Sequence, residues 1–387
     1  DATLPAELAV RDMTDLYLIS LTSGIETLID KGYAADLSAS EALLTDSARL
    51  YPAIASLLTR NGALYGVPVD CMVWAWATRG DASTGPLTLP ALLAARAAWA
   101  TNDANTGTPF LTNAYVGAEW TRADWARFVL TQYIVTRSDA AGPVDFATDE
   151  FAALLAALQA LPDTPAADGE FGIQIMVGEY AAAYSPTLQD TQAQGITAIP
   201  PPVLTVGDTP HVPTLVHAYV LNPLSAHKEA AMRFLEYVAQ NRDISTQALM
   251  CPGEAQNELT PGASATLLDL QTQLAQMPGR ILSAAAEHQA ALKAEAAQLE
   301  AAIEALYQNA GSWQLSQDEL NTYRTHIAPY LDLQLNPLLS DQYAMHAQSF
   351  TDMLALVTQC AGGLISPSQC EDRLNAIARL VWGESAK

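Results

Sequence analysis

The sequence has little positive charge: 18 lysines and arginines stand against 42 aspartates and glutamates, a formal net charge of −24 at pH 7. Proteins that hold nucleic acid or anionic lipid through phosphate neutralisation need clustered basic side chains. The balance therefore excludes broad phosphate neutralisation as a mode of binding, and we expect no nucleic-acid partner.

Long hydrophobic runs and cysteines are also scarce. The densest apolar stretch, residues 151–161, is shorter than the roughly 18 residues of a membrane span. The four cysteines are too few for a disulfide scaffold. Cys360 and Cys370 flank a short glycine turn, so two adjacent helices would bring them together. Two alternatives stay open for this pair, buried thiols or a disulfide formed outside the cytosol.

Common catalytic motifs are missing as well. The sequence has no Gly-x-Gly-x-x-Gly, no Gly-x-x-x-x-Gly-Lys, no Gly-x-Ser-x-Gly and no His-Glu-x-x-His. These absences argue against the usual nucleotide, hydrolase and metalloprotease sites, so we expect no enzyme activity, no cofactor and no metal. A pair of carboxylates from distant parts of the sequence, as glycosidases use, stays open.

The composition nevertheless predicts a substantial folded protein. Half of the 387 residues are hydrophobic and 16% are charged, which allows a large buried core. The length indicates two or three domains or one large two-lobed fold. The chain starts at Asp1 without a basic-then-apolar leader, and we expect that an export signal has already been removed.

Strand-like and helix-like stretches alternate over the first half of the chain. Strands are predicted at residues 16–19, 64–69, 72–77, 171–177 and 214–221. Helices are predicted between them, at 50–58, 89–99, 123–135 and 149–161. Asn61-Gly62 predicts a tight turn. This interleaving indicates α/β layers rather than a bundle or a sandwich.

The second half is predicted to be mostly helical. An apolar seam, with alternating spacings of four and three residues, runs along Leu292, Ala296, Leu299, Ile303 and Leu306. With the helix predicted at 265–277, this pattern indicates a helical hairpin, which we expect to lie on the body of the protein. Ser366 and Gln369 fit a capping box at the start of a further helix.

Aromatic residues gather near the predicted strand ends and loops. Aromatic faces suit stacking against the apolar face of a sugar ring, and a carboxylate at such a position accepts hydrogen bonds from hydroxyls. The alternative interpretation is ordinary packing in the core. On the first interpretation, the predicted ligand-binding residues are Asp70, Trp74, Tyr115, Trp120, Tyr180, Tyr184 and His217.

Four segments carry a family resemblance, in order along the chain. They are residues 28–38 (LIDKGYAADLS), 61–68 (NGALYGVP), 220–236 and 363–384. The second closely resembles an Asp/Asn-Gly-x-x-Tyr-Gly-x-Pro hairpin, and the third is similar to a returning strand followed by a helix. Together they resemble the extracellular solute-binding proteins (family 1) of ABC importers, in the version common in Gram-positive gut bacteria.

The resemblance implies a two-lobed α/β fold of the periplasmic-binding-protein type (type II), with a helical hairpin and a helical C-terminal region. Lobe one is expected at residues 1–74 and 218–325, with the hairpin at 264–308. Lobe two is expected at 75–217 and 326–387. Members of the family begin with a strand and a long helix before the segment that matches residues 12–20. A strand–helix unit is therefore expected to be missing, either from this chain or from the protein.

The resemblance also implies a function. It predicts an extracytoplasmic substrate-binding component of an ABC importer that captures a sugar or oligosaccharide in a cleft between lobes and closes by a hinge. The implied partner is a membrane permease, and the implied form is a monomer at the cell surface, lipid-anchored in the full-length protein. Two alternatives stay open: a transport-inactive interaction protein that uses the hairpin, and a glycan-active enzyme with two convergent carboxylates.

Overall fold

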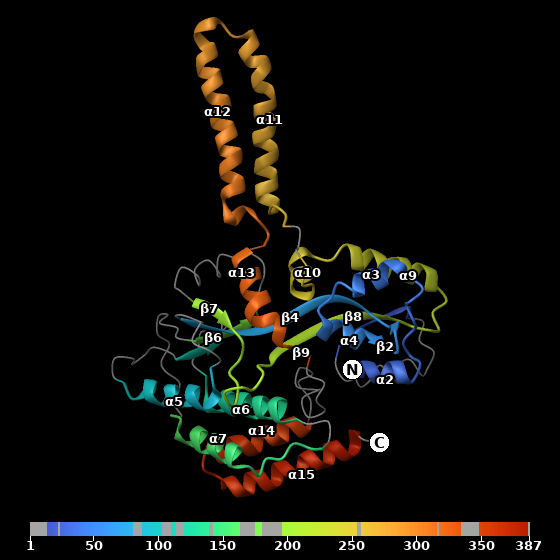
Figure 1. Ribbon diagram of the computed structural model, residues 1–387, viewed down its shortest axis with the longest axis vertical. Helices are drawn as coiled ribbons and strands as arrows, with labels where there is room; N and C mark the ends of the chain where they lie inside the picture. Colours follow the sequence, from blue (N-terminus) through green and yellow to red (C-terminus); the bar gives the residue numbers. More distant parts are fainter. Residues whose placement is uncertain are drawn as a thin grey trace.

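The protein consists of two hydrophobic cores, a mixed sheet that runs through both, and a projecting helical arm (Figure 1). The computed structural model describes residues 14–21, 24–79, 87–102, 110–113, 120–138, 142–162, 175–179, 196–253, 257–315, 317–333 and 348–385. The fold is described for these residues only.

Among the described residues, the main sheet has seven strands. Its central path runs in the order β1 (Leu16–Ser20), β8 (Val212–Leu221), β4 (Val67–Arg79), β6 (Ile175–Glu179) and β5 (Leu111–Asn113). Two further strands pair at its sides, β7 (Ile196–Ile199) with β4 and β9 (Leu331–Asp332) with β8. The pairs β5–β6 and β8–β9 are parallel and the other pairs are antiparallel.

Strand β4 corrects the prediction of two strands at 64–69 and 72–77, because it is one continuous strand of 13 residues. A register shift between Pro68 and Asp70 interrupts its pairing with β8 near the start. Such a bulge bends a strand without ending it. The turn before it is confirmed: Asn61 (φ 53°) and Gly62 (φ 81°) join β2 (Thr59–Arg60) to β3 (Ala63–Leu64), with the positive angles of a tight hairpin.

Core one lies between the β1–β8–β4 part of the sheet and a group of mostly short helices. Its buried members run from Tyr17 to Ala75 and from Val212 to Leu333. The helices are α2 (Gly24–Asp30), α3 (Glu41–Ser47), α4 (Pro52–Leu58), α9 (Lys228–Gln240), α10 (Ile244–Met250) and α13 (Gln317–Thr322), followed by the π turn at Tyr323–Ile327 and the 3₁₀ turn at Ala328–Tyr330.

Core two is built from longer helices packed beside β4, β5 and β6. Its buried members run from Trp76 to Leu204 and from Phe350 to Ala378. The helices are α5 (Leu89–Ala100), α6 (Arg122–Arg137), α7 (Asp149–Ala160), α14 (Gln348–Ala361) and α15 (Pro367–Ser385), which lie together below the sheet in Figure 1. The predicted capping box is confirmed: Ser366 Oγ accepts from Gln369 N (3.2 Å), and Ser366 N donates to Gln369 Oε1 (3.1 Å).

The helical hairpin is an arm that stands away from the body in Figure 1, which makes the prediction that it lies on the body wrong. It consists of α11 (Pro261–Ser283) and α12 (Ala286–Gln308), which pack against each other. The predicted seam is half-buried along α12, and the fully buried residue of the described arm is Met277. Helix α11 covers the seam of α12, so this seam does not remain to dock on the body.

The base of the arm is tied together where it joins the body. Leu259 and Trp313 form an antiparallel bridge, and Thr260 N donates to the Ser312 carbonyl (2.8 Å). Ser312 closes the short 3₁₀ helix at Ala310–Ser312. The chain therefore enters and leaves the arm at neighbouring points.

Among the described helices, none combines the length and apolar character that a membrane span requires.

Candidate functional site

Strand β4 passes from one core to the other, and its two faces have different surroundings. On one face, the side chains are buried in core one: Cys71, Val73 and Ala75. On the opposite face, the side chains are half-buried: Asp70, Met72 and Trp74. Two residues further along that second face, Trp76 is buried in core two. Because side chains alternate along a strand, the half-buried face lies where β4 leaves one core and enters the other.

Asp70 is held by the neighbouring strand at this place. Its register partner on β8 is His217, and its Oδ1 accepts from His217 N (3.2 Å) and lies 2.7 Å from His217 Nδ1. The side chains of Asp70 and His217 are 49% and 25% exposed. The backbone and ring contacts therefore use one carboxylate oxygen, and solvent reaches both side chains. A half-exposed carboxylate beside an imidazole is suited to hydrogen bonding with hydroxyl groups.

Trp74 lies on the same face as Asp70, four residues further along β4. At the rise of a β-strand this separation is about 13 Å. Trp74 is half-buried and is the register partner of Glu179 on β6. A hydrogen-bond acceptor and an aromatic ring therefore lie on one half-buried face of β4, and both group types occur in sites for polar ligands with apolar ring faces.

Trp120 lies beyond this face, over core two. It packs edge-to-face against Trp76 (5.6 Å between ring centroids), Trp125 (5.2 Å) and Phe128 (5.7 Å). The ring is half-buried, so it extends an aromatic cluster that begins on β4 with Trp76. The structure therefore brings Asp70, Trp74 and His217 to one face of the sheet. Trp120 is not on that face, because it packs against Trp76 in core two. Three predicted site residues lie outside the described residues: Tyr115, Tyr180 and Tyr184.

Sequence reasoning missed two apolar residues of the same face. Met72 stands between Asp70 and Trp74 on β4, and its register partner on β8 is Leu215. Leu215 is 9% exposed and Met72 is half-buried. The alternation of β4 starting from Asp70 would have indicated Met72. Leu215 could be recognised only from the pairing of β4 with β8, which joins residues far apart in the sequence.

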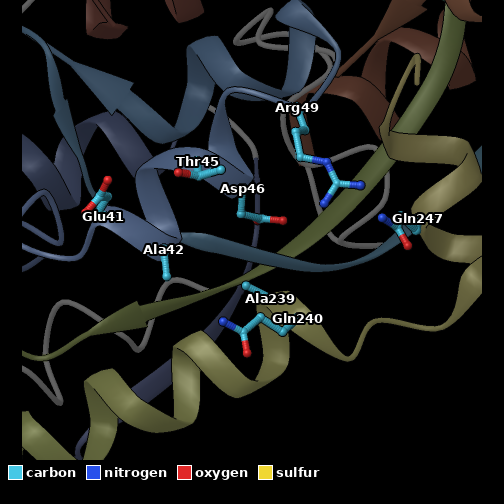
Figure 2. Close-up of a pocket in the computed structure, with 8 residues that line it drawn as sticks. All are labelled: Glu41, Ala42, Thr45, Asp46, Arg49, Ala239, Gln240 and Gln247. Atoms are coloured by element: carbon cyan, nitrogen blue, oxygen red, sulfur yellow. The ribbon is translucent and has the colours of Figure 1, made fainter. Parts of the chain in front are cut away.

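A pocket of 410 Å³ lies elsewhere, on the outside of core one between α3, α9 and α10 (Figure 2). Its polar lining consists of Glu41, Thr45, Asp46, Arg49, Gln240 and Gln247. Asp46 is already engaged there, because its two oxygens accept from Arg242 Nη1 (2.7 Å) and Nη2 (2.5 Å). Arg242 also donates from Nε to the Pro68 carbonyl (2.7 Å). We interpret this ion pair as a structural connection between the helices and the start of β4.

No metal site emerges from the side chains that the structure describes. Within those ranges, no group of three or more histidines, cysteines, aspartates and glutamates is arranged to hold an ion. The contacts at Asp70 and His217 are those of an ordinary hydrogen-bonded pair.

Comparison with solved structures identifies the fold, whereas no family model and no curated protein sequence matches the chain. The GacH receptor of Streptomyces glaucescens is similar with a TM-score of 0.54 and 13% identity, over 99% of this chain and 87% of that chain. An ABC transporter solute-binding protein of Agrobacterium radiobacter gives 0.52 and 14%, over 98% and 88%. The sugar-binding protein MalE of Xanthomonas citri gives 0.52 and 10%, over 100% and 88%. The protein thus has the two-lobed α/β fold of periplasmic-binding-protein type.

Proposed function

We propose that this chain is the substrate-binding component of an ABC importer, and that it captures a carbohydrate between its lobes outside the cytoplasm. The observation that carries the proposal is the half-buried sheet face between the two cores, where Asp70 of β4 pairs with His217 of β8 and Trp74 follows on the same face of β4. The fold supports it, because the structurally similar proteins include one in complex with acarbose and one in complex with ribitol.

The chemistry of this face favours a sugar over a nucleotide or an anion. Asp70 supplies an acceptor for hydroxyl hydrogens, His217 supplies a second polar group, and Trp74 supplies an aromatic surface. A net charge of −24 disfavours phosphorylated ligands. On this proposal the protein is a monomer at the cell surface that is lipid-anchored in its full-length form and delivers the sugar to a membrane permease.

A thermal-shift screen tests this function directly. The full chain is to be heated with and without a panel of malto-oligosaccharides, other oligosaccharides, monosaccharides and sugar alcohols. A sugar present at 100 times its Kd stabilises the folded state by about 2.7 kcal/mol. We expect at least one glycan class to raise the Tm by several degrees, while amino acids and nucleotides leave it unchanged. A panel without any stabilising glycan would refute the proposal.

Replacement of Asp70 by alanine is expected to weaken sugar binding by about 10- to 100-fold, the value of one or two charge-assisted hydrogen bonds. The measurement is isothermal titration with the best sugar of the panel. The matched control is Asp15→Ala, which removes the carboxylate of another Asp–His pair, Asp15 with His227 (3.3 Å), at the far end of β8. We expect the control to bind like the unaltered protein. Equal losses in the two variants would contradict the assignment of Asp70.

Removal of the arm tests whether the sugar site lies on the body of the protein. Because Leu259 and Trp313 are bridged at its base, residues 261–311 can be replaced by a short turn without pulling the body apart. We expect this variant to bind the sugar with a Kd within about twofold of the original, since the site lies on β4 and β8. A complete loss of binding in a variant that still unfolds cooperatively would place the ligand site on or beside the arm.

A further inference from the structure

Two buried cysteines meet where the last two helices join. Cys360 lies in the last turn of α14 and Cys370 in the first turns of α15, and both side chains are 0% exposed. Both are free thiols in the structure, and they interact electrostatically, since Cys360 contributes to the raised pKa of Cys370. Both side chains belong to the buried cluster of core two, on the two sides of the turn that joins the packed helices α14 and α15.

The backbone holds both cysteines in place. Gly363 (φ 74°) ends α14 in a Schellman motif, in which Leu364 N donates to the Gln359 carbonyl (2.9 Å) and Gly363 N to the Cys360 carbonyl (2.9 Å). The side chain of Gln159 on α7 donates to the same Cys360 carbonyl (2.9 Å). On the other side, the Ser366 capping box fixes the first turn of α15, and Cys370 N donates to the Ser366 carbonyl (3.0 Å).

We propose that Cys360 and Cys370 form an intramolecular disulfide that joins α14 to α15. The oxidant is a low-molecular-weight disulfide such as oxidised glutathione, or a disulfide-donating oxidoreductase. One protein thiolate attacks the oxidant, whose S–S bond breaks and releases one thiolate. The second protein thiolate then attacks the mixed disulfide and releases the other. Two protein protons pass to the two released thiolates, so one disulfide is consumed for each one formed.

The bond forms during folding rather than in the finished protein. Burial, the neighbouring Cys360 and the negative charge of Glu371 raise the pKa of Cys370 to about 12, and burial also raises the pKa of Cys360. Arg373 opposes this effect at Cys370 only in part. Thiolates are the reacting form, so the folded pair exchanges slowly. In the unfolded chain both thiols are accessible, and the nine residues between them allow a short loop to close.

The test uses the unaltered full chain. The protein is reduced and unfolded, refolded in a mixture of oxidised and reduced glutathione, unfolded again with iodoacetamide, and digested with trypsin. Cys360 and Cys370 share the tryptic peptide 325–373, whereas Cys71 and Cys251 lie in peptides 61–79 and 243–280. We expect peptide 325–373 to be unalkylated and lighter than its reduced form by about 2 Da. Both other peptides should be alkylated, and chymotryptic cleavage after Leu364 should leave the two halves linked.

A stability measurement shows whether the native structure accommodates the bond. We expect the refolded, oxidised protein to melt about 5 to 10 °C above the same protein with reductant, the effect of closing a short loop in a domain of this size. The control, Cys370→Ser refolded in the same mixture, should show no dependence of its Tm on reductant. Two alkyl groups on peptide 325–373 after oxidative refolding, a linkage to Cys251, or a lower Tm after oxidation would each overturn the proposal.

Discussion

Replacement of Asp46 by alanine is expected to lower the free energy of unfolding by about 3–5 kcal/mol, the cost of removing one partner of a buried ion pair. Its partner Arg242 has a side chain that is only 2% exposed, and Asp46 itself is 12% exposed. The substitution leaves the guanidinium with the Pro68 carbonyl and without a counter-charge. Arg242 would then be a buried, uncompensated cation, and the connection from α3 to the chain between α9 and α10 would be lost.

The matched control is Asp30→Ala, because Asp30 also forms an ion pair with an arginine, Arg60. In that pair Arg60 Nη2 lies 3.1 Å from Asp30 Oδ1, and the side chains are 38% and 57% exposed. Exposed pairs contribute about 0–1 kcal/mol, so we expect almost no change. Urea unfolding followed by circular dichroism measures both variants. Similar losses in the free energy of unfolding of the two variants would mean that burial does not make the Arg242–Asp46 pair more stabilising than an exposed pair.

The second large effect is expected from Phe151→Ala in core two, at about 3–5 kcal/mol. The ring is fully buried, and it packs against Tyr133 (4.6 Å between centroids) and Phe146 (5.1 Å). Truncation removes the apolar contacts of the whole ring and leaves a cavity that the packed helices cannot close.

The control for Phe151 is Leu380→Ala, which truncates a large apolar residue on α15 that is 61% exposed. Its truncation removes little buried surface, so we expect a change below about 0.5 kcal/mol. Urea unfolding again provides the measurement. A loss for Leu380→Ala as large as that for Phe151→Ala would show that the packing of core two differs from the structure described above.

The elements that the sequence predicts well are those with local signals. The turn at Asn61-Gly62 and the capping box at Ser366 depend on residues within a few positions of each other, and both are confirmed. The continuity of β4 could not be predicted, because Asp70 interrupts the apolar pattern and the strand is held by partners on β6, β7 and β8. The seam of α12 indicated that the helix is packed, but a seam does not indicate which surface covers it.

The candidate site shows the same division between local and distant information. Asp70 and Trp74 share a face because of the two-residue period of a strand, which the sequence contains. The contact of Asp70 with His217 joins residues 147 positions apart and depends on the register of β4 against β8. A bulge beside Asp70 sets that register, and no periodicity in the sequence indicates it. Leu215 was missed for this reason.

The most direct test of the central claim is hydrogen–deuterium exchange of the full chain with and without the best sugar from the thermal-shift panel. We predict that the sugar slows amide exchange in peptides from β4 (residues 67–79) and β8 (212–221), and leaves the arm (261–308) unchanged. Slower exchange only around the pocket of α3, α9 and α10, or only in the arm, would contradict a carbohydrate site between the two lobes.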